Sequence, residues 1–416
     1  MGEWKRVKLS DLGRVVTGKT PSTKNEAFWN GSIPFVTPGD LQSTKHIFGT
    51  ARYVTDDGAN AVVSAVLPAG SICVSCIGVI GYVGITTTTS LSNQQINSIV
   101  VNQENDRDFV YYLLKGKWDE FKQMEGFSSV VSILNKSTFS DIEACVPDLP
   151  TQRRIAAVLG ALDDKIEVNR KICENLEAQA QALFKAWFVD FEPFKGTMVD
   201  DSLWGEHPKE LEYVRVGDIN PVLETGSRPK GGAATSGIPS IGAENVKQLG
   251  VFDFGAKKYI PEEFAQKLKR GKIHGYELLL YKDGGKPGMF KPHFSMFGEG
   301  FPYEECYINE HVFKVDFGSC ETNVFAYFYF KSQYVFNWLE TNGAKAAIPG
   351  INQTNVLDVM MPNPEHVLVK QFGEKVLPAF KMIFTKCKES CALAAMRDAL
   401  LPKLMSGELA VEKVEV

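Results

Sequence analysis

Several features that mark whole classes of protein are missing from this sequence. Its 416 residues contain no apolar run long enough to cross a membrane as a helix, and residues 1–8 contain no stretch that could serve as a secretory signal. Hydrophobic residues make up 44% and charged residues 23% of the chain, which excludes a disordered protein and allows sizeable cores. At roughly 100–200 residues per domain, we expect about two to four globular domains in a cytoplasmic protein.

A pattern of metal-ligating or disulfide-forming residues is also missing. The eight cysteines are scattered, at Cys73, Cys76, Cys145, Cys173, Cys306, Cys320, Cys387 and Cys391. Cys73 and Cys76 have the spacing of half a zinc site, but no second ligand pair follows, and the histidines form no HxxxH or HExxH pattern. We therefore expect reduced thiols, buried in the case of Cys73 and Cys76, and no bound metal.

A strong excess of one charge is absent as well. The formal net charge is −5, and no long segment is strongly basic. A protein that binds nucleic acid through its overall charge would be basic. Binding to DNA would therefore rely on local patches and on help from a partner.

What the sequence does contain is an internal repeat. Leu134-Asn135, Asp141-Ile142 and Pro147 correspond at one constant spacing to Ile351-Asn352, Asp358-Val359 and Pro364. Further pairs follow in the same order: Val7–Leu12 with Val214–Ile219, Ile33-Pro34 with Ile238-Pro239, Gly70 with Gly275, and Asn93-Gln94 with Asn309-Glu310. So many matches in one order indicate a duplicated unit.

Both copies follow the same plan. Short apolar runs between turn residues, at 5–105 and 212–320, predict strands. A helical patch follows at Phe109–Met124 and at Asn323–Glu340, and each copy closes on a long helical pattern.

The first long helical pattern has the spacing of a coiled coil. Its seam residues recur at alternating steps of four and three: Ile155, Leu159, Leu162, Ile166, Asn169, Cys173, Leu176, Ala180, Leu183 and Trp187. A helix over Thr151–Trp187 would be a rod of roughly 55 Å whose apolar seam needs a partner. The second pattern, from about Val369 to Met405, supplies one, although Pro378 should kink that helix or delay its start. We predict an antiparallel pair; the alternative is that the helices belong to two separate cores.

These patterns predict an α+β protein with two tandem globular units and two long helices paired as an antiparallel coiled coil. The predicted segments are a first globular unit at 1–148, a central helix at 149–195, a second globular unit at 196–364, and a C-terminal helix and tail at 365–416.

Two motifs imitate catalytic sites. Gly13–Thr20 (GRVVTGKT) matches the phosphate-binding pattern GxxxxGK[ST], but the polar residues before it and Pro21 after it do not fit a strand–loop–helix. Pro147-Asp148 with Asp163–Lys165 imitates a nuclease motif, but the second part lies in the long helix, where residues i and i+2 point apart. There is also no [ND]PP[YF] amide-methylation motif and no GxGxxG loop, so we expect no catalysis and no bound cofactor.

Several segments resemble the specificity subunits of type I restriction–modification systems. The most specific is Leu149–Ala156 (LPTQRRIA), continued by Leu162–Ile166 (LDDKI) and Ala182–Phe188 (ALFKAWF). Weaker matches are Val7–Leu12, Thr17–Ser22, Trp29–Pro34, Gly78–Ile85, Asn93–Gln95 and Leu400–Leu409. The resemblance extends over the whole chain and includes the duplication.

The resemblance implies that each globular unit is a target-recognition domain for one half of a split, asymmetric DNA site, and that the helices set the spacing. It implies a non-catalytic subunit that assembles on double-stranded DNA with two methyltransferase (modification) subunits and a restriction/motor subunit. S-adenosylmethionine, ATP and Mg²⁺ would be bound by those partners. The second helix departs from the pattern, because Val369–Phe372 (VKQF) stands where the first helix has Gln152–Ile155 (QRRI).

Polar and basic residues near glycines are the candidate DNA contacts, since such loops suit phosphates and base edges. In the first unit they are Lys19, Thr20, Ser22, Lys24, Lys45 and Arg52. In the second unit they are Ser227, Arg228, Lys230, Lys282, Lys286 and Lys345, and the densest basic run is Lys267–Lys272. Asn135 and Asn352, which match across the repeat, are interpreted as turn or cap residues.

Two other classes of function remain as alternatives. A coiled-coil scaffold that joins proteins and ignores DNA would show only a weak DNA shift, unchanged by modification subunits. An enzyme would show hydrolysis that is lost when Lys19 or Asp148 is substituted.

Overall fold

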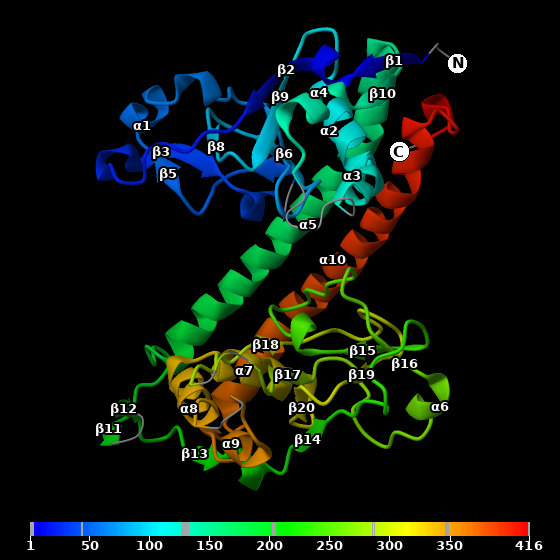
Figure 1. Ribbon diagram of the computed structural model, residues 1–416. Helices are drawn as coiled ribbons and strands as arrows, with labels where there is room; N and C mark the ends of the chain where they lie inside the picture. Colours follow the sequence, from blue (N-terminus) through cyan, green and yellow to red (C-terminus); the bar gives the residue numbers. More distant parts are fainter. Residues whose placement is uncertain are drawn as a thin grey trace. The chain divides into compact units, whose positions relative to one another are not determined.

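The computed structural model describes residues 4–42, 45–125, 133–201, 205–284, 286, 288–345 and 349–414 (Figure 1). The chain divides into two compact units. The first consists of residues 1–168 and 391–416, and the second of residues 169–390. Each unit therefore contains a globular part and a portion of both long helices. No helix among the described residues is apolar over a stretch long enough to cross a membrane.

The first unit is built on short strands. They are β1 (Lys5–Lys8), β2 (Gly13–Thr17), β3 (Trp29–Val36), β4 (His46–Ile47), β5 (Tyr53–Val54), β6 (Ile72–Ser75), β7 (Val83–Thr86), β8 (Leu91–Ser92), β9 (Ile96–Val101) and β10 (Glu143–Val146). They form a five-stranded sheet in the order β2-β9-β6-β7-β4, a three-stranded sheet in the order β5-β3-β8, and the ribbon β1-β10. Its short helices are α1 (Asp56–Asn60), α2 (Arg107–Gly116), α3 (Trp118–Glu125) and α4 (Lys136–Asp141).

The second unit has matching elements and one additional hairpin. Its strands are β11 (Met198–Asp201), β12 (Gly205–Pro208), β13 (Tyr213–Arg215), β14 (Val222–Thr225), β15 (Ile238–Ile241), β16 (Tyr259–Ile260), β17 (Leu278–Tyr281), β18 (Phe294–Ser295), β19 (Tyr307–Ile308), β20 (Val312–Asp316) and β21 (Met360–Pro362). Its short helices are α6 (Glu262–Ala265), α7 (Cys320–Phe330), α8 (Gln333–Gly343) and α9 (Gln353–Leu357). The hairpin β11-β12 has no counterpart among the described strands of the first unit.

The strand orders confirm the internal repeat. The sheet β14-β20-β17-β18 repeats β2-β9-β6-β7, the sheet β16-β15-β19 repeats β5-β3-β8, and β13-β21 repeats β1-β10. The cap interpretation is confirmed too, because the side chains of Asn135 and Asn352 accept the backbone N–H groups of Thr138 (3.0 Å) and Asn355 (2.9 Å) at the starts of α4 and α9.

One pair of the predicted repeat, Gly70 with Gly275, is wrong by one residue. Cys73 pairs with Ser98, and Leu279 pairs with Lys314 at the same place in the second sheet. This register aligns Gly70 with Tyr276 rather than with Gly275, and both Gly70 and Tyr276 have a positive φ. The predicted helical patches also differ from the structure, since each consists of two helices, α2 with α3 and α7 with α8.

The long helices are α5 (Leu149–Phe188) and α10 (Val367–Met405). Asp148 caps α5 by accepting the N–H of Thr151 at 3.0 Å, and the hydrogen bonds from Thr151 hold the pKa of Asp148 below its ordinary value. Pro378 lies inside α10, so the expected late start of this helix is wrong. The buried neighbours Val376, Leu377 and Phe380 keep the segment helical despite the missing N–H group.

Within each unit the two helices run antiparallel, as predicted. In the second unit Asn169 contacts Ser390, and further along α5 Cys173 contacts the carbonyl of Ile383, so residue numbers rise on one helix while they fall on the other. In the first unit Asp163 of α5 pairs with Arg397 of α10. The seam residues are all buried or half-buried. The alternative of separate cores also holds in part, because both helices take part in the core of each unit.

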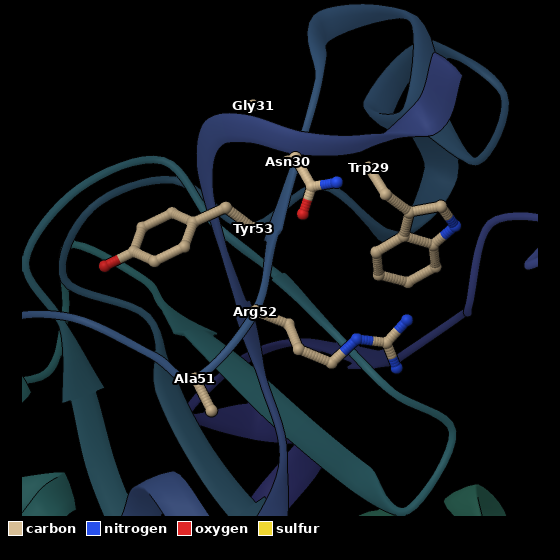
Figure 2. Close-up of a pocket in the computed structure, with 6 residues that line it drawn as sticks. All are labelled: Trp29, Asn30, Gly31, Ala51, Arg52 and Tyr53. Carbon is tan, nitrogen blue, oxygen red and sulfur yellow. The ribbon is translucent and has the colours of Figure 1, made fainter. Parts of the chain in front are cut away.

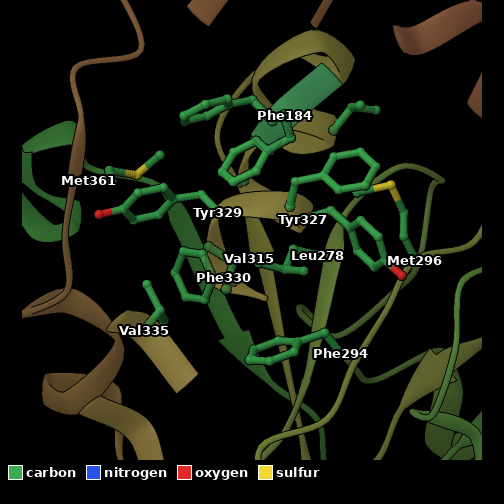
Figure 3. Packing of buried hydrophobic residues seen from close by; sticks show 14 of the residues in the cluster. Phe184, Leu278, Phe294, Met296, Val315, Tyr327, Tyr329, Phe330, Val335 and Met361 are labelled. Carbon is green, nitrogen blue, oxygen red and sulfur yellow. The ribbon is translucent and has the colours of Figure 1, made fainter. Parts of the chain in front are cut away.

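Figure 3 shows part of the core of the second unit. The segment α7 is apolar and aromatic on every side, so it is a buried helix rather than an amphipathic one. Phe184 of α5 lies 5.9 Å from Phe328 of α7 and 5.8 Å from Phe372 of α10, measured between ring centroids. In each unit a buried tyrosine joins α5 to a shorter helix. Tyr112 of α2 donates to Asp163 at 2.6 Å, and Tyr327 of α7 donates to Glu177 at 2.9 Å.

Candidate nucleic-acid interface

One glycine directs an equivalent loop in each unit. Gly18 follows β2, and a Cβ at this residue would lie 2.0 Å from the carbonyl oxygen of Asn93. Gly226 follows β14, and a Cβ there would lie 1.8 Å from the carbonyl oxygen of Ile308. Only glycine permits so close a crossing of two backbones. The segments Thr17–Ser22 (TGKTPS) and Thr225–Lys230 (TGSRPK) therefore leave their sheets through equivalent glycine crossings.

Side chains at equivalent positions make equivalent contacts in these two segments. Thr20 donates its hydroxyl to Oε1 of Gln94 at 2.6 Å. Two residues after its glycine in the same way, Arg228 places Nε 2.9 Å from Oε1 of Glu310. Thr20 and Arg228 thus occupy equivalent positions in their own units. The first unit has a neutral pair at this position, and the second has an ion pair.

Four of the six candidates of the first unit, Lys19, Thr20, Ser22 and Lys24, lie in the loop between β2 and β3, and a fifth, Arg52, contacts Trp29 at the start of β3. Lys19 reaches Oγ of Ser64 at 3.1 Å. Ser22 accepts Nε1–H of Trp29 through its backbone carbonyl at 3.2 Å, and the guanidinium of Arg52 lies 3.9 Å from the centre of the Trp29 ring. Lys24, in the same loop, is exposed.

Arg52 lines a small pocket in the surface of the first unit (Figure 2). The pocket has a volume of about 290 Å³ and is lined by Trp29, Asn30, Gly31, Ala51, Arg52 and Tyr53. Figure 2 shows the guanidinium of Arg52 next to the indole of Trp29, with the side chains of Asn30 and Tyr53 at the other edges. Trp29, Asn30 and Tyr53 were not among the predicted contacts. Asn30 has a positive φ and lies in β3 where the pairing with β5 shifts register, between Trp29 and Ile33.

Lys45 is placed differently from the other candidates. Its side chain is only 10% exposed, and its ammonium lies 2.8 Å from Asp108. Burial alone would raise the pKa of Asp108, but Lys45 and Arg107 more than offset it and lower that pKa. This ammonium stabilises the interior of the unit, so among the predicted contacts Lys45 has the least freedom to reach DNA.

The remaining candidates lie in the second unit. Ser227 follows Gly226 and is half-buried. Lys282 donates to the carbonyl of Glu310 at 3.0 Å, and Lys345 donates to Oδ1 of Asn342 at 3.1 Å. Lys230 and Lys286 are exposed, as are Lys267, Lys269 and Arg270 of the basic run. Lys272, the last residue of that run, pairs with Glu305 at 3.1 Å.

The two motifs that imitate catalytic sites have structural roles. Gly13–Thr17 is the strand β2, paired antiparallel with β9, and the next element after its loop is a short 3-10 helix at Glu26–Phe28, so the frame of a phosphate-binding loop is not present. Asp148 caps α5, and Asp163 is bonded to Tyr112 and Arg397. No group of histidine, cysteine or carboxylate side chains in the described residues could hold a metal ion.

The cysteines among the described residues are free thiols. Burial raises the pKa of Cys73 to about 12 and that of Cys76 to about 11. A thiol with so high a pKa is protonated at neutral pH and a poor metal ligand or nucleophile. The prediction that these two residues are buried thiols is confirmed.

Comparison with known proteins places the chain in a class. Residues 1–178 match the family model described as the type I restriction modification DNA specificity domain. The chain is 30% identical to the type I restriction enzyme MjaIX specificity subunit of Methanocaldococcus jannaschii, over 99% of this chain and 95% of that protein. It is 35% identical over 178 residues to the HindI specificity subunit of Haemophilus influenzae, which covers 41% of this chain and 39% of that one.

A solved structure agrees with these sequence matches. The S subunit of a type I restriction–modification system from M. genitalium superimposes with a TM-score of 0.55, at 15% identity, over 97% of this chain and 96% of that chain. At this identity the likeness shows the fold. Together with the full-length relative, it supports the class predicted from the sequence. The chain belongs to the family of type I restriction–modification specificity subunits, which are non-catalytic.

Proposed function

We propose that each unit of this chain reads one half of a bipartite, asymmetric DNA site. One observation carries the proposal: the loops after Gly18 and Gly226 begin at equivalent backbone crossings but present different side chains. Two readers with one backbone and different donors suit two different half-sites, because sequence is read by donors and acceptors aimed at base edges. In this proposal the twelve predicted contacts remain candidates, with Lys45 the weakest.

The long helices would set the distance between the half-sites and carry two modification subunits. α5 keeps its coiled-coil seam inside, and residues such as Arg153, Asp164 and Lys171 are exposed on its other faces. Such polar outer faces are suited to protein partners. We propose further that S-adenosylmethionine, ATP and Mg²⁺ are bound by the modification and restriction subunits, and that the assembly acts in the cytoplasm.

The experiment that tests this function maps adenine methylation by single-molecule sequencing. Cells carrying the modification subunit would be compared with and without this chain. We expect a split, asymmetric methylated motif that disappears with the chain. If methylation is absent, or is the same without the chain, the DNA-reading role is wrong.

The spacing role has its own test. Removing one heptad from α5 together with the facing seven residues of α10 shortens the pair by roughly 10 Å, about three base pairs, at 1.5 Å per residue and 3.4 Å per base pair. We expect a shorter spacer between unchanged half-sites in the methylated motif. A change in the half-sites themselves would contradict the role of the helices as a ruler.

A further inference from the structure

We propose that Arg52 of the first unit reads the major-groove edge of a guanine, and that Trp29 holds its guanidinium in position for this contact. The inference rests on the proposed function and assigns one base and two residues within it. Trp29 is a positioning residue in this proposal, and Arg52 is the group that touches DNA.

The position of Arg52 is fixed by aromatic rings. Its guanidinium carbon lies 3.9 Å from the centre of the Trp29 ring and 5.5 Å from that of Phe35. Trp29 is itself held, since its Nε1–H donates to the carbonyl of Ser22 at 3.2 Å and its ring packs edge-on against Phe35. Stacking covers one face of a guanidinium and leaves its N–H edges open, so less freedom is lost when those edges bind a ligand.

Within the described part of the chain, the charge of Arg52 has no acidic partner. Arg52 is exposed, and the described interactions of its side chain are those with the two aromatic rings; no carboxylate of the described residues pairs with it. Three arginines of the first unit differ from it, because Arg6 pairs with Glu143, Arg107 with Asp108 and Arg154 with Glu412. A fixed, unpaired guanidinium fork matches O6 and N7 of guanine, to which arginine donates two hydrogen bonds.

The surroundings of Arg52 favour a base over a phosphate. The amide of Asn30 lines the same pocket, and the next residue, Gly31, packs closely against β5, since a Cβ there would lie 2.4 Å from the carbonyl oxygen of Val54. A volume of about 290 Å³ is at the lower end for a ligand site, which is typically ~300–1,000 Å³, so it suits the edge of one base rather than a whole cofactor. Contacts to the phosphate backbone need neither a pocket nor a second polar group.

The second unit lacks this arrangement at the same position. Phe35 donates its N–H to the carbonyl of Arg52 at 3.0 Å, and Ser240 donates to that of Lys258 at 2.9 Å, which makes Lys258 the equivalent residue. Lys258 pairs with Glu244 at 2.8 Å. The two units therefore offer different chemistry at one point of the same fold, as two different half-sites require.

The test uses the full chain assembled with its modification subunits and a pool of randomised duplexes, from which bound DNA is selected and sequenced. The variants are Arg52→Lys, which keeps the charge but not the fork, and Trp29→Leu. The controls are Arg14→Lys, an exposed arginine of β2 outside the pocket, and Lys258→Met in the second unit. Thermal unfolding of each variant shows whether the chain is still folded.

For Arg52→Lys we expect the preference for guanine at one position of one half-site to fall by roughly 5- to 150-fold, with the other half-site unchanged. Trp29→Leu should lower the guanine preference at the same position to a smaller degree. Neither control variant should change this preference. If Arg52→Lys lowers binding of all sequences equally and reduces its salt dependence, Arg52 contacts a phosphate and the inference is wrong. Unaltered guanine preference would also overturn it. If the unaltered complex selects no split site at all, the proposed function itself fails.

Discussion

Each unit contains its own copy of the same sheet, and the two copies differ in the side chains at the centre. In the first unit Val16 faces Ser98 across β2 and β9, and Ser98 donates to the sulfur of Cys73 at 3.4 Å. At the same place in the second unit Glu224 faces Lys314, whose ammonium lies 3.0 Å from Glu224 and 3.8 Å from Glu277. One backbone arrangement therefore tolerates either an apolar and hydroxyl centre or a buried ion cluster.

The difference shows which residues specify this topology. The features common to both units are Gly18 and Gly226 at the backbone crossing, and Asn135 and Asn352 at the helix caps. These residues satisfy backbone geometry and backbone hydrogen bonds, which the fold requires regardless of the side chains around them. The sheet centre and the loop tips are free to diverge, and the loop tips are where the two units present different donors.

The largest expected effect comes from breaking the ion cluster of the second unit. Lys314→Met leaves the buried Glu277 and the half-buried Glu224 without their cation, which should lower the free energy of unfolding of that unit by about 3–5 kcal/mol. Ser98→Ala, at the equivalent position of the first unit, removes one weak hydrogen bond and should cost at most about 1.5 kcal/mol. Hydrogen exchange of the full chain in urea would measure the two units separately.

A combined substitution sharpens this result. Lys314→Met with Glu224→Val and Glu277→Leu replaces the whole cluster by apolar side chains and should recover most of the lost stability. If the triple variant is as unstable as Lys314→Met alone, the ion cluster contributes net stability to the second unit beyond the neutralisation of its own buried charges.

A smaller effect is expected where α5 and α10 begin. Gln152 is buried and connects α5 to the residues before α2, with hydrogen bonds to the N–H of Asp106 (2.9 Å), to Asn105 (3.1 Å) and to the carbonyl of Pro147 (3.0 Å). Its counterpart on α10 is Val369, which is buried and apolar. Gln152→Val should leave these groups unsatisfied and cost about 1–3 kcal/mol in thermal unfolding. Arg153→Val, on the exposed face, should stay within about 0.5 kcal/mol; equal losses would mean that Gln152 acts only through helix propensity.

Acid should loosen the two units at different places. Burial would raise the pKa of Glu224, but the N–H of Gly271 and the ammonium of Lys314 hold that pKa below its ordinary value of 4.5. A depressed pKa contributes stability above the unfolded value that is lost as the pH falls through the folded value. Below about pH 4.5 we expect amides of β14, β17 and β20 to lose protection in hydrogen exchange.

The first unit should respond through its helices instead of its sheet. The pKa values of Asp108 and Asp163 are lowered because nearby lysine and arginine side chains more than offset their burial. Acid should therefore expose amides of α2 and α5 while β2, β6 and β9 remain protected. Equal loss of protection in both sheets at the same pH would contradict the difference between their centres.

Periodicity and motif spacing predicted much of this structure, and their limits are physical. The seam from Ile155 to Trp187 and the repeat were found because both depend on local or regularly spaced patterns. The burial of Lys45 was not found, because its partner Asp108 is far along the chain and becomes a neighbour only on folding. The Arg52–Trp29 contact was missed for the same reason. The one-residue error at Gly70 arose because a shift of one residue in strand register leaves the amino-acid composition of the segment unchanged.

The smallest expected effect concerns the polar residue of the helix seam. Asn169 is fully buried; its Nδ2 donates to Ser390 at 3.3 Å, but its Oδ1 has no partner among the described residues. Asn169→Leu should raise the free energy of unfolding by up to about 1 kcal/mol, because it removes an unsatisfied acceptor and extends the apolar seam. Asn175→Leu, on the exposed side of α5, controls for helix propensity and should change stability less. If Asn169→Leu lowers the melting temperature instead, Oδ1 is satisfied in solution, and Asn169 stabilises the helix pair rather than fixing its register at a cost.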